Sequence, residues 1–468
     1  MADQHLPTGQ AINRDAQARK LTPEERSNLL DVWVEDMHGL RPVGVLERYP
    51  EAGYPVHSTV VFFYHNGLAD EDAVSITMPI RRDGYQSKLA GLSGNLPPIF
   101  DQNIPEGALH DYLVRRYMKV VENMGDFDLL RLAGNRSIGR IRVVPHGVVP
   151  SPFVPESPTA QAILADPDAQ KLLDALFEQL ATYSGVSGVQ PKVLLEGQVD
   201  ASLVSPKPSN GRRLTIQHEG YIVKASGRDY PGLAINEYLC LYACEMSGLN
   251  TAKAELSDDG SVLVLSRFDK DPEGRPLGFE DMACLSGYTS QDKYKGSYED
   301  MIKILRLMIE PDAMASVLPE VFKSIALTCV LGNGDGHLKN FGLLYTDPTR
   351  SAYLAPAFDI CCTLAYLPED QLALSMNKSK NFPNRATLTK FGRISCLLKP
   401  KEINDILKQV EMGVEAAAIE LEYYRKRDQA FYVHCGEGMR QAWKAGMRHT
   451  LAMGDEYELP GDIGIKQV

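Results

Sequence analysis

The sequence predicts an α+β protein whose two lobes follow a small N-terminal α+β subdomain, and three observations lead to this fold class. Strand-like apolar runs and tight turns dominate up to about residue 270, whereas helical apolar spacing dominates from about residue 280 onward. Five prolines between residues 144 and 158 mark a linker, because proline favours extended backbone and prevents helix. At about one domain per 150 residues, 468 residues allow two or three domains, and 44% hydrophobic content excludes wholesale disorder.

The N-terminal part is expected to consist of a polar arm, residues 1–30, and the α+β subdomain, residues 31–148. A short helix is predicted near residue 22, since Thr22 can cap it, Pro23 suits its first position and two acidic residues follow. Strand-like runs between glycine- and proline-rich turns predict the sheet of the subdomain. The expected strands are 42–46, 57–64 and 74–78, and the expected helices are 107–123 and 126–133.

Residues 149–270 are expected to form a strand-rich lobe with one prominent helix, and residues 271–468 a helical lobe. A Ser247-Gly248 pair fits the end of the prominent helix, because glycine readily adopts the backbone conformation that stops a helix. The expected elements, in order, are a helix at 160–183, strands at 192–195, 214–217 and 221–224, a helix at 234–246, a strand at 261–265, helices at 297–309 and 319–331, a strand at 341–345 and a helix at 401–425.

Charge and cysteine content limit the classes of function. A net charge of −12 argues against broad binding to nucleic acid or to an anionic membrane, so any DNA contact needs a local basic groove or a partner. The eight cysteines form no CxxC or CxxH pair, which indicates small core residues in a reducing cytosol rather than a zinc site or a disulfide framework. We find no signal-like apolar segment and no uninterrupted apolar run of membrane-spanning length, and we therefore expect a soluble, cytoplasmic protein.

The segment from Leu331 to Phe341 carries the strongest chemical signal. Three glycines alternate with polar residues, so the backbone can turn sharply while Asp335 and His337 project from a loop. Asp335 and Asn340 have the spacing DxxxxN, in which a carboxylate can accept a hydrogen bond from an attacking hydroxyl and an amide oxygen can bind Mg²⁺. The alternative is a turn in which Asn and Asp side chains only satisfy their own backbone.

Asp359 is a candidate for a second Mg²⁺ ligand. It follows a strand-like stretch 24 residues after Asp335, as the Asp of an Asp-Phe-Gly turn does in protein kinases. Here the order is Phe358-Asp359 and no glycine follows. Alone, this pair is typical of a strand that ends in a turn, so its position relative to Asp335 and Asn340 carries the hypothesis.

Three further elements lie upstream, in the order that phosphoryl transfer from a nucleotide requires. Residues 183–192 join a helix to a strand through small residues whose backbone N–H groups could approach a phosphate, although an ordinary tight turn would look the same. Lys224 ends an apolar strand, and Glu237 on the following helix could orient it towards phosphates. The alternative is an edge-strand lysine with a solvated acid. Residues 266–269 then offer a hinge whose backbone could meet an adenine ring.

With these elements in place, the sequence resembles the HipA family, the serine/threonine kinases of bacterial toxin–antitoxin modules. The resemblance is specific from about 183 to 395, looser from 40 to 148, where Ile104–Gly107 resembles the small N-terminal subdomain, and absent from residues 1–30. The matching segments are Ser187–Lys192, Asn236–Tyr238, Arg267–Asp269, Gly296–Asp300, Gly332–Phe341, Leu354–Asp359 and Leu372–Asn377.

The resemblance implies a two-lobed, protein-kinase-like fold of HipA type that uses ATP and Mg²⁺. It implies that Asp335 is the catalytic base, that Lys224 holds the α- and β-phosphates, and that His337 and Lys339 contact phosphate or position the loop. Asn340 and Asp359 are the implied metal ligands. The residues implied to bind the nucleotide or its metal are Ser187, Gly188, Val189, Gln190, Lys192, Lys224, Glu237, Arg267, Phe268, His337, Lys339, Asn340 and Asp359.

One position departs from the family pattern. Family members commonly carry a serine that is autophosphorylated two residues before the position of Ser187, and this chain has Gly185 there. Autophosphorylation could therefore use Ser187, use Ser184 or be absent.

The resemblance also implies partners. They are a protein substrate, for which aminoacyl-tRNA synthetases are family examples, and a HipB-like helix-turn-helix antitoxin that would provide DNA binding indirectly. Two other functions stay open from the sequence: a non-catalytic, nucleotide-binding corepressor, and a kinase of small molecules.

Overall fold

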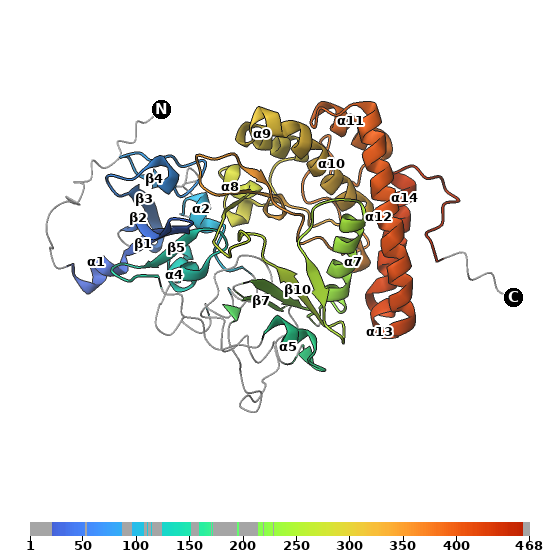
Figure 1. Cartoon of the computed structure of the whole chain (residues 1–468), viewed down its shortest axis with the longest axis horizontal. Coiled ribbons are helices and arrows are strands. Elements are labelled where there is room, and N and C mark those ends of the chain that lie inside the picture. Colours follow the sequence, from blue (N-terminus) through green and yellow to red (C-terminus); the bar gives the residue numbers. More distant parts are fainter. Residues whose placement is uncertain are drawn as a thin grey trace.

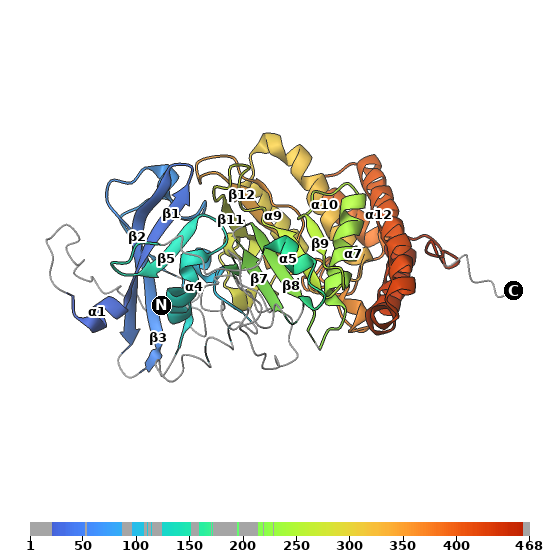
Figure 2. The same cartoon turned by 60° about the horizontal axis from the view of Figure 1, so that its bottom comes forward.

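In the computed structural model, the molecule is elongated, with the N-terminal sheet at one end and the C-terminal helices at the other (Figure 1). A second sheet lies between these ends in both views (Figure 2). The structure describes residues 21–51, 54–86, 96–106, 110, 114, 124–150, 159–169, 171, 194–195, 214–218, 220–227 and 229–461.

The first sheet is antiparallel and has the order β4-β3-β2-β1-β5. Alternate residues of its β1 strand, Leu30, Val32 and Val34, are fully buried, because successive side chains of a strand point to opposite faces. The predicted helix near residue 22 is confirmed, since Thr22 and Glu25 form a capping box. The elements of this subdomain are α1 (Pro23–Ser27), β1 (Leu29–Asp36), β2 (Gly39–Glu51), β3 (Tyr54–Tyr64), β4 (Tyr85–Gln86), α2 (Pro98–Asp101), α4 (Asp126–Ala133) and β5 (Ile141–Pro145).

The predicted strand at 74–78 is wrong. Residues 75 and 78 form only an isolated bridge around a turn. Ser75 Oγ and the Ile76 backbone N–H donate to the carboxylate of Glu280, at 2.7 and 2.8 Å. The backbone N–H of Thr77 bonds Ser75 Oγ at 2.9 Å. These backbone groups are thus satisfied by side chains rather than by a neighbouring strand. The expected strands 42–46 and 57–64 lie within β2 and β3, and the helix 126–133 is α4, while most of the helix expected at 107–123 lies outside the described residues.

The second sheet has the order β6-β7-β8-β10-β9 and separates two buried clusters. Val262 and Val264 of β10 pack with the cluster of the N-terminal sheet, whereas Leu263 and Leu265 pack with the C-terminal cluster. The elements of this part are α5 (Ala160–Leu164), β6 (Leu194–Leu195), β7 (Leu214–His218), β8 (Tyr221–Ala225), α7 (Leu233–Met246), β9 (Ala254–Leu256) and β10 (Val262–Ser266). The strands and the helix expected from 192 to 265 are confirmed, while most of the helix expected at 160–183 lies outside the described residues.

The C-terminal part contains a small antiparallel sheet, β11-β12-β13, and a layer of helices. The long α12 packs along α7, with Gly413 at their contact (Figure 2). The elements are β11 (Gly278–Asp281), α8 (Met282–Leu285), α9 (Tyr298–Met308), α10 (Met314–Val330), β12 (Gly342–Tyr345), β13 (Tyr353–Leu354), α11 (Arg385–Ile394), α12 (Pro400–Arg427), α13 (Gln429–Phe431) and α14 (Glu437–His449). All elements expected between 297 and 425 are confirmed.

The α10 helix is a core helix. The segment Pro311–Val330 is long and apolar enough to cross a membrane, and it alone passes that test within the described ranges, but 67% of its 18-residue apolar window is buried inside the protein. Glu320 and Lys323 interrupt its apolar sequence. Its buried residues, among them Phe322 and Ile325, form the centre of the C-terminal cluster. The eight cysteines are free thiols, and all but Cys361 are buried, as predicted.

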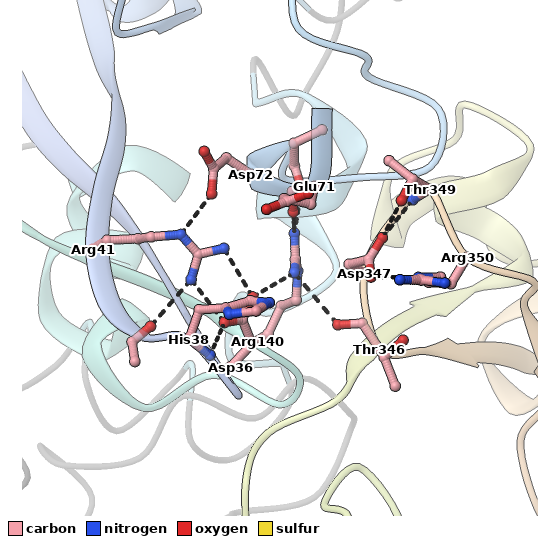
Figure 3. Close-up of polar contacts among 12 residues, drawn as sticks. Asp36, His38, Arg41, Glu71, Asp72, Arg140, Thr346, Asp347, Thr349 and Arg350 are labelled. Atoms are coloured by element: carbon pink, nitrogen blue, oxygen red, sulfur yellow. Dashed lines mark hydrogen bonds and ion pairs between the residues drawn. The ribbon is translucent and has the colours of Figure 1, made fainter. Parts of the chain in front are cut away.

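Arg140 fastens the N-terminal subdomain to the C-terminal part. Its guanidinium is fully buried, pairs with Asp36 at 2.8 Å, and donates to the backbone carbonyls of Glu71 at 2.7 Å and Ala73 at 2.6 Å (Figure 3). It also reaches the carbonyl of Thr346, directly after β12, at 3.5 Å. One buried cation thus joins two segments of the subdomain to the sheet that carries the predicted catalytic loop.

Candidate active site

Lys224 lies between two carboxylates from different parts of the chain. Its Nζ is 2.5 Å from Glu237 Oε1 on α7 and 2.6 Å from Asp359 Oδ1. The side chains of Lys224 and Glu237 are 7% and 0% exposed, whereas that of Asp359 is 35% exposed. The buried acid therefore fixes the ammonium group, and the second acid faces the more open side, where a solute can reach it.

The loop from Leu331 to Phe341 connects α10 to β12. Asn333 Oδ1 accepts from the backbone N–H of Asp335 at 3.0 Å, and Asn340 Oδ1 accepts from that of His337 at 3.1 Å. Both amides thus stabilise the turn itself, as the alternative interpretation expected. At Gly334, a Cβ atom would lie 2.1 Å from Asp370 Oδ2, so only glycine fits this close approach.

Asn340 and Asp359 lie side by side. Asn340 Nδ2 donates to the backbone carbonyl of Asp359 at 3.2 Å. Asp359 has a φ of 56°, in the left-handed region that non-glycine residues adopt rarely and that is found at functional sites. In this turn the left-handed residue is the aspartate itself, and Ile360 rather than a glycine follows it.

The donor atoms of Asn340 and Asp359 fit Mg²⁺, which prefers carboxylate and amide oxygens. Within the described ranges, no group of three or more His, Cys, Asp or Glu residues could hold a metal ion. A cation at Asn340 and Asp359 would therefore take its remaining ligands from phosphate oxygens or water, as Mg²⁺ does in nucleotide sites.

Asp335 has a partner that the sequence did not indicate. Tyr294, from the segment before α9, donates its hydroxyl to Asp335 Oδ1 at 2.8 Å. Burial and the nearby Asp335 carboxylate raise the pKa of Tyr294, so its phenol stays protonated at neutral pH. The tyrosine lies 41 residues before the aspartate, and no local pattern links the two.

His337 is buried beside the ring of Tyr294, with the ring centroids 5.2 Å apart. Burial, helped by the charge of Lys293, lowers the pKa of His337 to about 4, so the imidazole is neutral at pH 7. Its Nδ1 has no hydrogen-bond partner within the part of the chain that the structure describes. Lys339 turns towards the N-terminal subdomain, where its ammonium contacts Glu106. This contact fits the loop-positioning alternative for Lys339.

The side chains of the predicted hinge pack inside the protein. Arg267 pairs with Asp269 at 2.5 Å, and Asp269 also accepts from the backbone N–H of Gly139 at 2.8 Å. Phe268 packs against Phe358, with the ring centroids 5.1 Å apart. A contact of this segment with a nucleotide base would therefore come from the backbone of the segment.

The expected phosphate loop lies outside the described residues. The residues concerned are Ser184, Gly185, Ser187, Gly188, Val189, Gln190 and Lys192. Of the other predicted site residues, the structure brings Lys224, Glu237, Asn340 and Asp359 together, and places Asp335 and His337 on the same loop as Asn340.

Two family models match the chain. The model described as the HipA-like C-terminal domain matches residues 184–418, and the model described as the HipA N-terminal domain matches residues 30–144.

Two proteins of Sinorhizobium fredii, Y4dM and Y4mE, are similar in sequence, and both are named as kinases by inference. Y4dM is 29% identical over 305 residues, which cover 61% of this chain and 67% of Y4dM. Y4mE is 26% identical over 335 residues, which cover 66% of this chain and 74% of Y4mE.

The fold is similar to that of HipA from Shewanella oneidensis MR-1, which was solved in a complex with HipB and operator DNA. The TM-score is 0.57 at 17% sequence identity, and the match covers 90% of this chain and 97% of that one. The predicted two-lobed α+β fold is thus confirmed.

Proposed function

The chain belongs to the HipA family, and on that premise we propose that it is a kinase that transfers the γ-phosphate of ATP to a serine or threonine hydroxyl of a protein. The observation that carries the proposal is the position of the Lys224 ammonium, 2.5 Å from the buried Glu237 and 2.6 Å from the more exposed Asp359. A lysine paired with a buried acid, near an aspartate and an asparagine, is the arrangement that protein kinases use to hold the nucleotide phosphates and their metal.

In the proposed reaction, Lys224 exchanges its contact with Asp359 for the α- and β-phosphates, while Glu237 keeps it in place. The acceptor oxygen attacks the γ-phosphorus, the bond from that phosphorus to the ADP oxygen breaks, and the hydroxyl proton passes to Asp335. Mg²⁺, held by the oxygens of Asn340 and Asp359, would neutralise charge on the phosphate oxygens when bound.

The Tyr294 hydroxyl marks where the acceptor group would lie. It donates to Asp335 Oδ1 at 2.8 Å, which is the hydrogen bond that an acceptor hydroxyl makes to a catalytic base. Because Tyr294 is 44% exposed, its side chain can rotate away from Asp335 when a substrate chain enters. The neutral His337 behind it adds no positive charge next to the base.

We further propose a HipB-like antitoxin as partner, as HipB accompanies HipA in the Shewanella complex. Such a partner would supply the DNA contacts that a chain of net charge −12 does not favour by itself. The cytoplasm is the compartment that fits both a nucleotide substrate and eight free thiols. The phosphate loop and its autophosphorylation at Ser187 or Ser184 belong to the same proposal.

The test is incubation of the protein with γ-labelled ATP, Mg²⁺ and cell extract, followed by separation of protein and small-molecule fractions. We expect label in serine or threonine of protein for the wild type and none for Asp335→Ala or Asp359→Ala. Asp312→Ala, which changes an exposed acid at the opposite end of α10 from the loop, is the matched control and should label as the wild type does.

Other results would contradict the proposal. Label confined to small molecules would assign a small-molecule kinase instead. Nucleotide binding without any transfer, together with repression retained in Asp335→Ala, would assign the corepressor function. Transfer that is undiminished in both variants would refute the assigned site.

A further inference from the structure

Lys339 lies near the end of the predicted catalytic loop, directly before Asn340, and its side chain contacts the N-terminal subdomain. Its Nζ lies 2.5 Å from Glu106 Oε1, 3.0 Å from Ser290 Oγ and 3.4 Å from the backbone carbonyl of Gln102. The side chain is only 8% exposed. The ammonium group of this loop residue is therefore buried against the N-terminal subdomain, and it takes no part in the proposed phosphoryl transfer.

Glu106 is the acid that receives this cation, and it belongs to the Ile104–Gly107 segment that the sequence marks out. Its second oxygen pairs with Lys293 at 2.8 Å. Burial alone would raise the pKa of Glu106, but the ammonium groups of Lys339 and Lys293 lower it to about 2. Glu106 is therefore ionised at every physiological pH.

The segment that carries Glu106 is itself fixed to the C-terminal part. Gln102 donates to the carbonyl of Phe279 at 2.9 Å and accepts from the backbone N–H of Asp281 at 3.2 Å, both on β11. Asp101 accepts from the Ser290 hydroxyl at 2.7 Å. Together with the buried Arg140 (Figure 3), these contacts fix the position of the subdomain relative to the loop.

We propose that Glu106 is a positioning residue for catalysis: through the Lys339 ammonium, the N-terminal subdomain holds the catalytic loop so that Asp335 and Asn340 keep their places. The inference rests on the proposed function for its effect on turnover. Since Lys224 and Glu237 lie on β8 and α7, outside this network, loss of the anchor should lower turnover much more than it weakens ATP binding, to which Asn340 would contribute one metal ligand.

The two lysines on Glu106 provide a matched pair of variants, because both side chains are 8% exposed and bind the same acid. Lys339→Gln removes the loop anchor and leaves the Glu106–Lys293 pair, so Glu106 itself keeps one counter-charge. Lys293→Gln removes the other cation and leaves the anchor. Glu106→Gln removes the charge of both ion pairs and should match Lys339→Gln in its effect on the loop.

The experiment measures kcat, the KM for ATP, and hydrogen exchange of a peptide over residues 332–341, in the full-length protein. For Lys339→Gln we expect kcat to fall on the order of 10- to 100-fold, the KM for ATP to rise by no more than about fivefold, and exchange at the loop to become faster. The exchange readout is direct, since the amide of Leu338 bonds the Lys293 carbonyl at 3.1 Å and that of Asn340 bonds His337 O at 3.0 Å. Lys293→Gln should resemble the wild type in all three.

The outcomes separate this inference from the proposed function. Unchanged loop exchange in Lys339→Gln, or equal loosening in Lys293→Gln, would overturn the inference. A raised KM for ATP at unchanged kcat would also overturn it, because it would assign Lys339 to phosphate binding. Faster loop exchange in a protein whose wild type transfers no phosphate would support the anchor and reject the proposed kinase activity.

Discussion

Replacing Glu237 by glutamine tests the ion pair that fixes Lys224. Glutamine has nearly the same shape as glutamate, so the substitution opens no cavity and removes only a charge. Glu237 is fully buried and Lys224 is 7% exposed, so the ammonium would lose its nearest counter-charge in a dry environment. Breaking a buried ion pair by removing one partner costs about 3 to 5 kcal/mol.

The contact from Lys224 to Asp359, at 2.6 Å, reduces that cost because one counter-charge remains. We therefore expect Glu237→Gln to lower the free energy of unfolding by about 2 to 3 kcal/mol. We also expect weaker ATP binding, since Lys224 is then drawn to Asp359 and less available to phosphates. Urea denaturation and equilibrium ATP binding measure the two effects.

Glu245→Gln is the matched control, because Glu245 lies on the same helix with its side chain exposed. It should change the free energy of unfolding by less than about 0.5 kcal/mol. If Glu237→Gln were as stable as the control and bound ATP as the wild type does, the buried pair would not hold the lysine and the reasoning would be refuted.

Three other predictions concern the base, the helix packing and a buried acid. Asp335→Asn should slow single-turnover phosphate transfer by about 10²- to 10⁴-fold with ATP affinity unchanged, and a rate near that of the wild type would contradict its role as base. Gly413→Ala places a Cβ 1.9 Å from Ser247 Oγ, so it should lower the free energy of unfolding, measured in urea, by about 1 to 3 kcal/mol. An unchanged free energy of unfolding would mean that α7 and α12 can move apart without cost. Burial raises the pKa of Asp101 from 3.8 to about 7, so the folded state keeps a proton that the unfolded state releases. The free energy of unfolding should therefore fall as pH rises from about 4 to 7, by up to about 4 kcal/mol, and Asp101→Asn should flatten that slope in denaturation measured across this range.

The sequence predicted those parts of the site that are encoded locally. The Asp335 to Asn340 loop is recognisable because its glycines and polar residues are consecutive, and the Lys224 strand and Glu237 helix have clear apolar patterns. The structure then shows that Lys224 and Asp359, 135 residues apart, meet at 2.6 Å, as the order of the motifs suggested. The ion pair is a fact of the structure, whereas the catalytic roles of these residues stay predictions.

The parts that could not be predicted depend on contacts between distant segments. The turn at 74–78 reads as a strand until Glu280, 205 residues later, takes up its backbone and side-chain donors. The Tyr294 contact to Asp335 and the Lys339 contact to Glu106 span 41 and 233 residues. A lysine in a polar loop gives no local sign that it will be buried, because its partner belongs to another subdomain.

The most direct test of the central claim is a structure of the protein with Mg²⁺ and a non-hydrolysable ATP analogue. We predict that the cation lies between the side-chain oxygens of Asn340 and Asp359, and that Lys224 Nζ leaves Asp359 for a phosphate oxygen while it keeps its contact with Glu237. A triphosphate bound away from these residues, with the Lys224–Asp359 pair intact, would contradict the account.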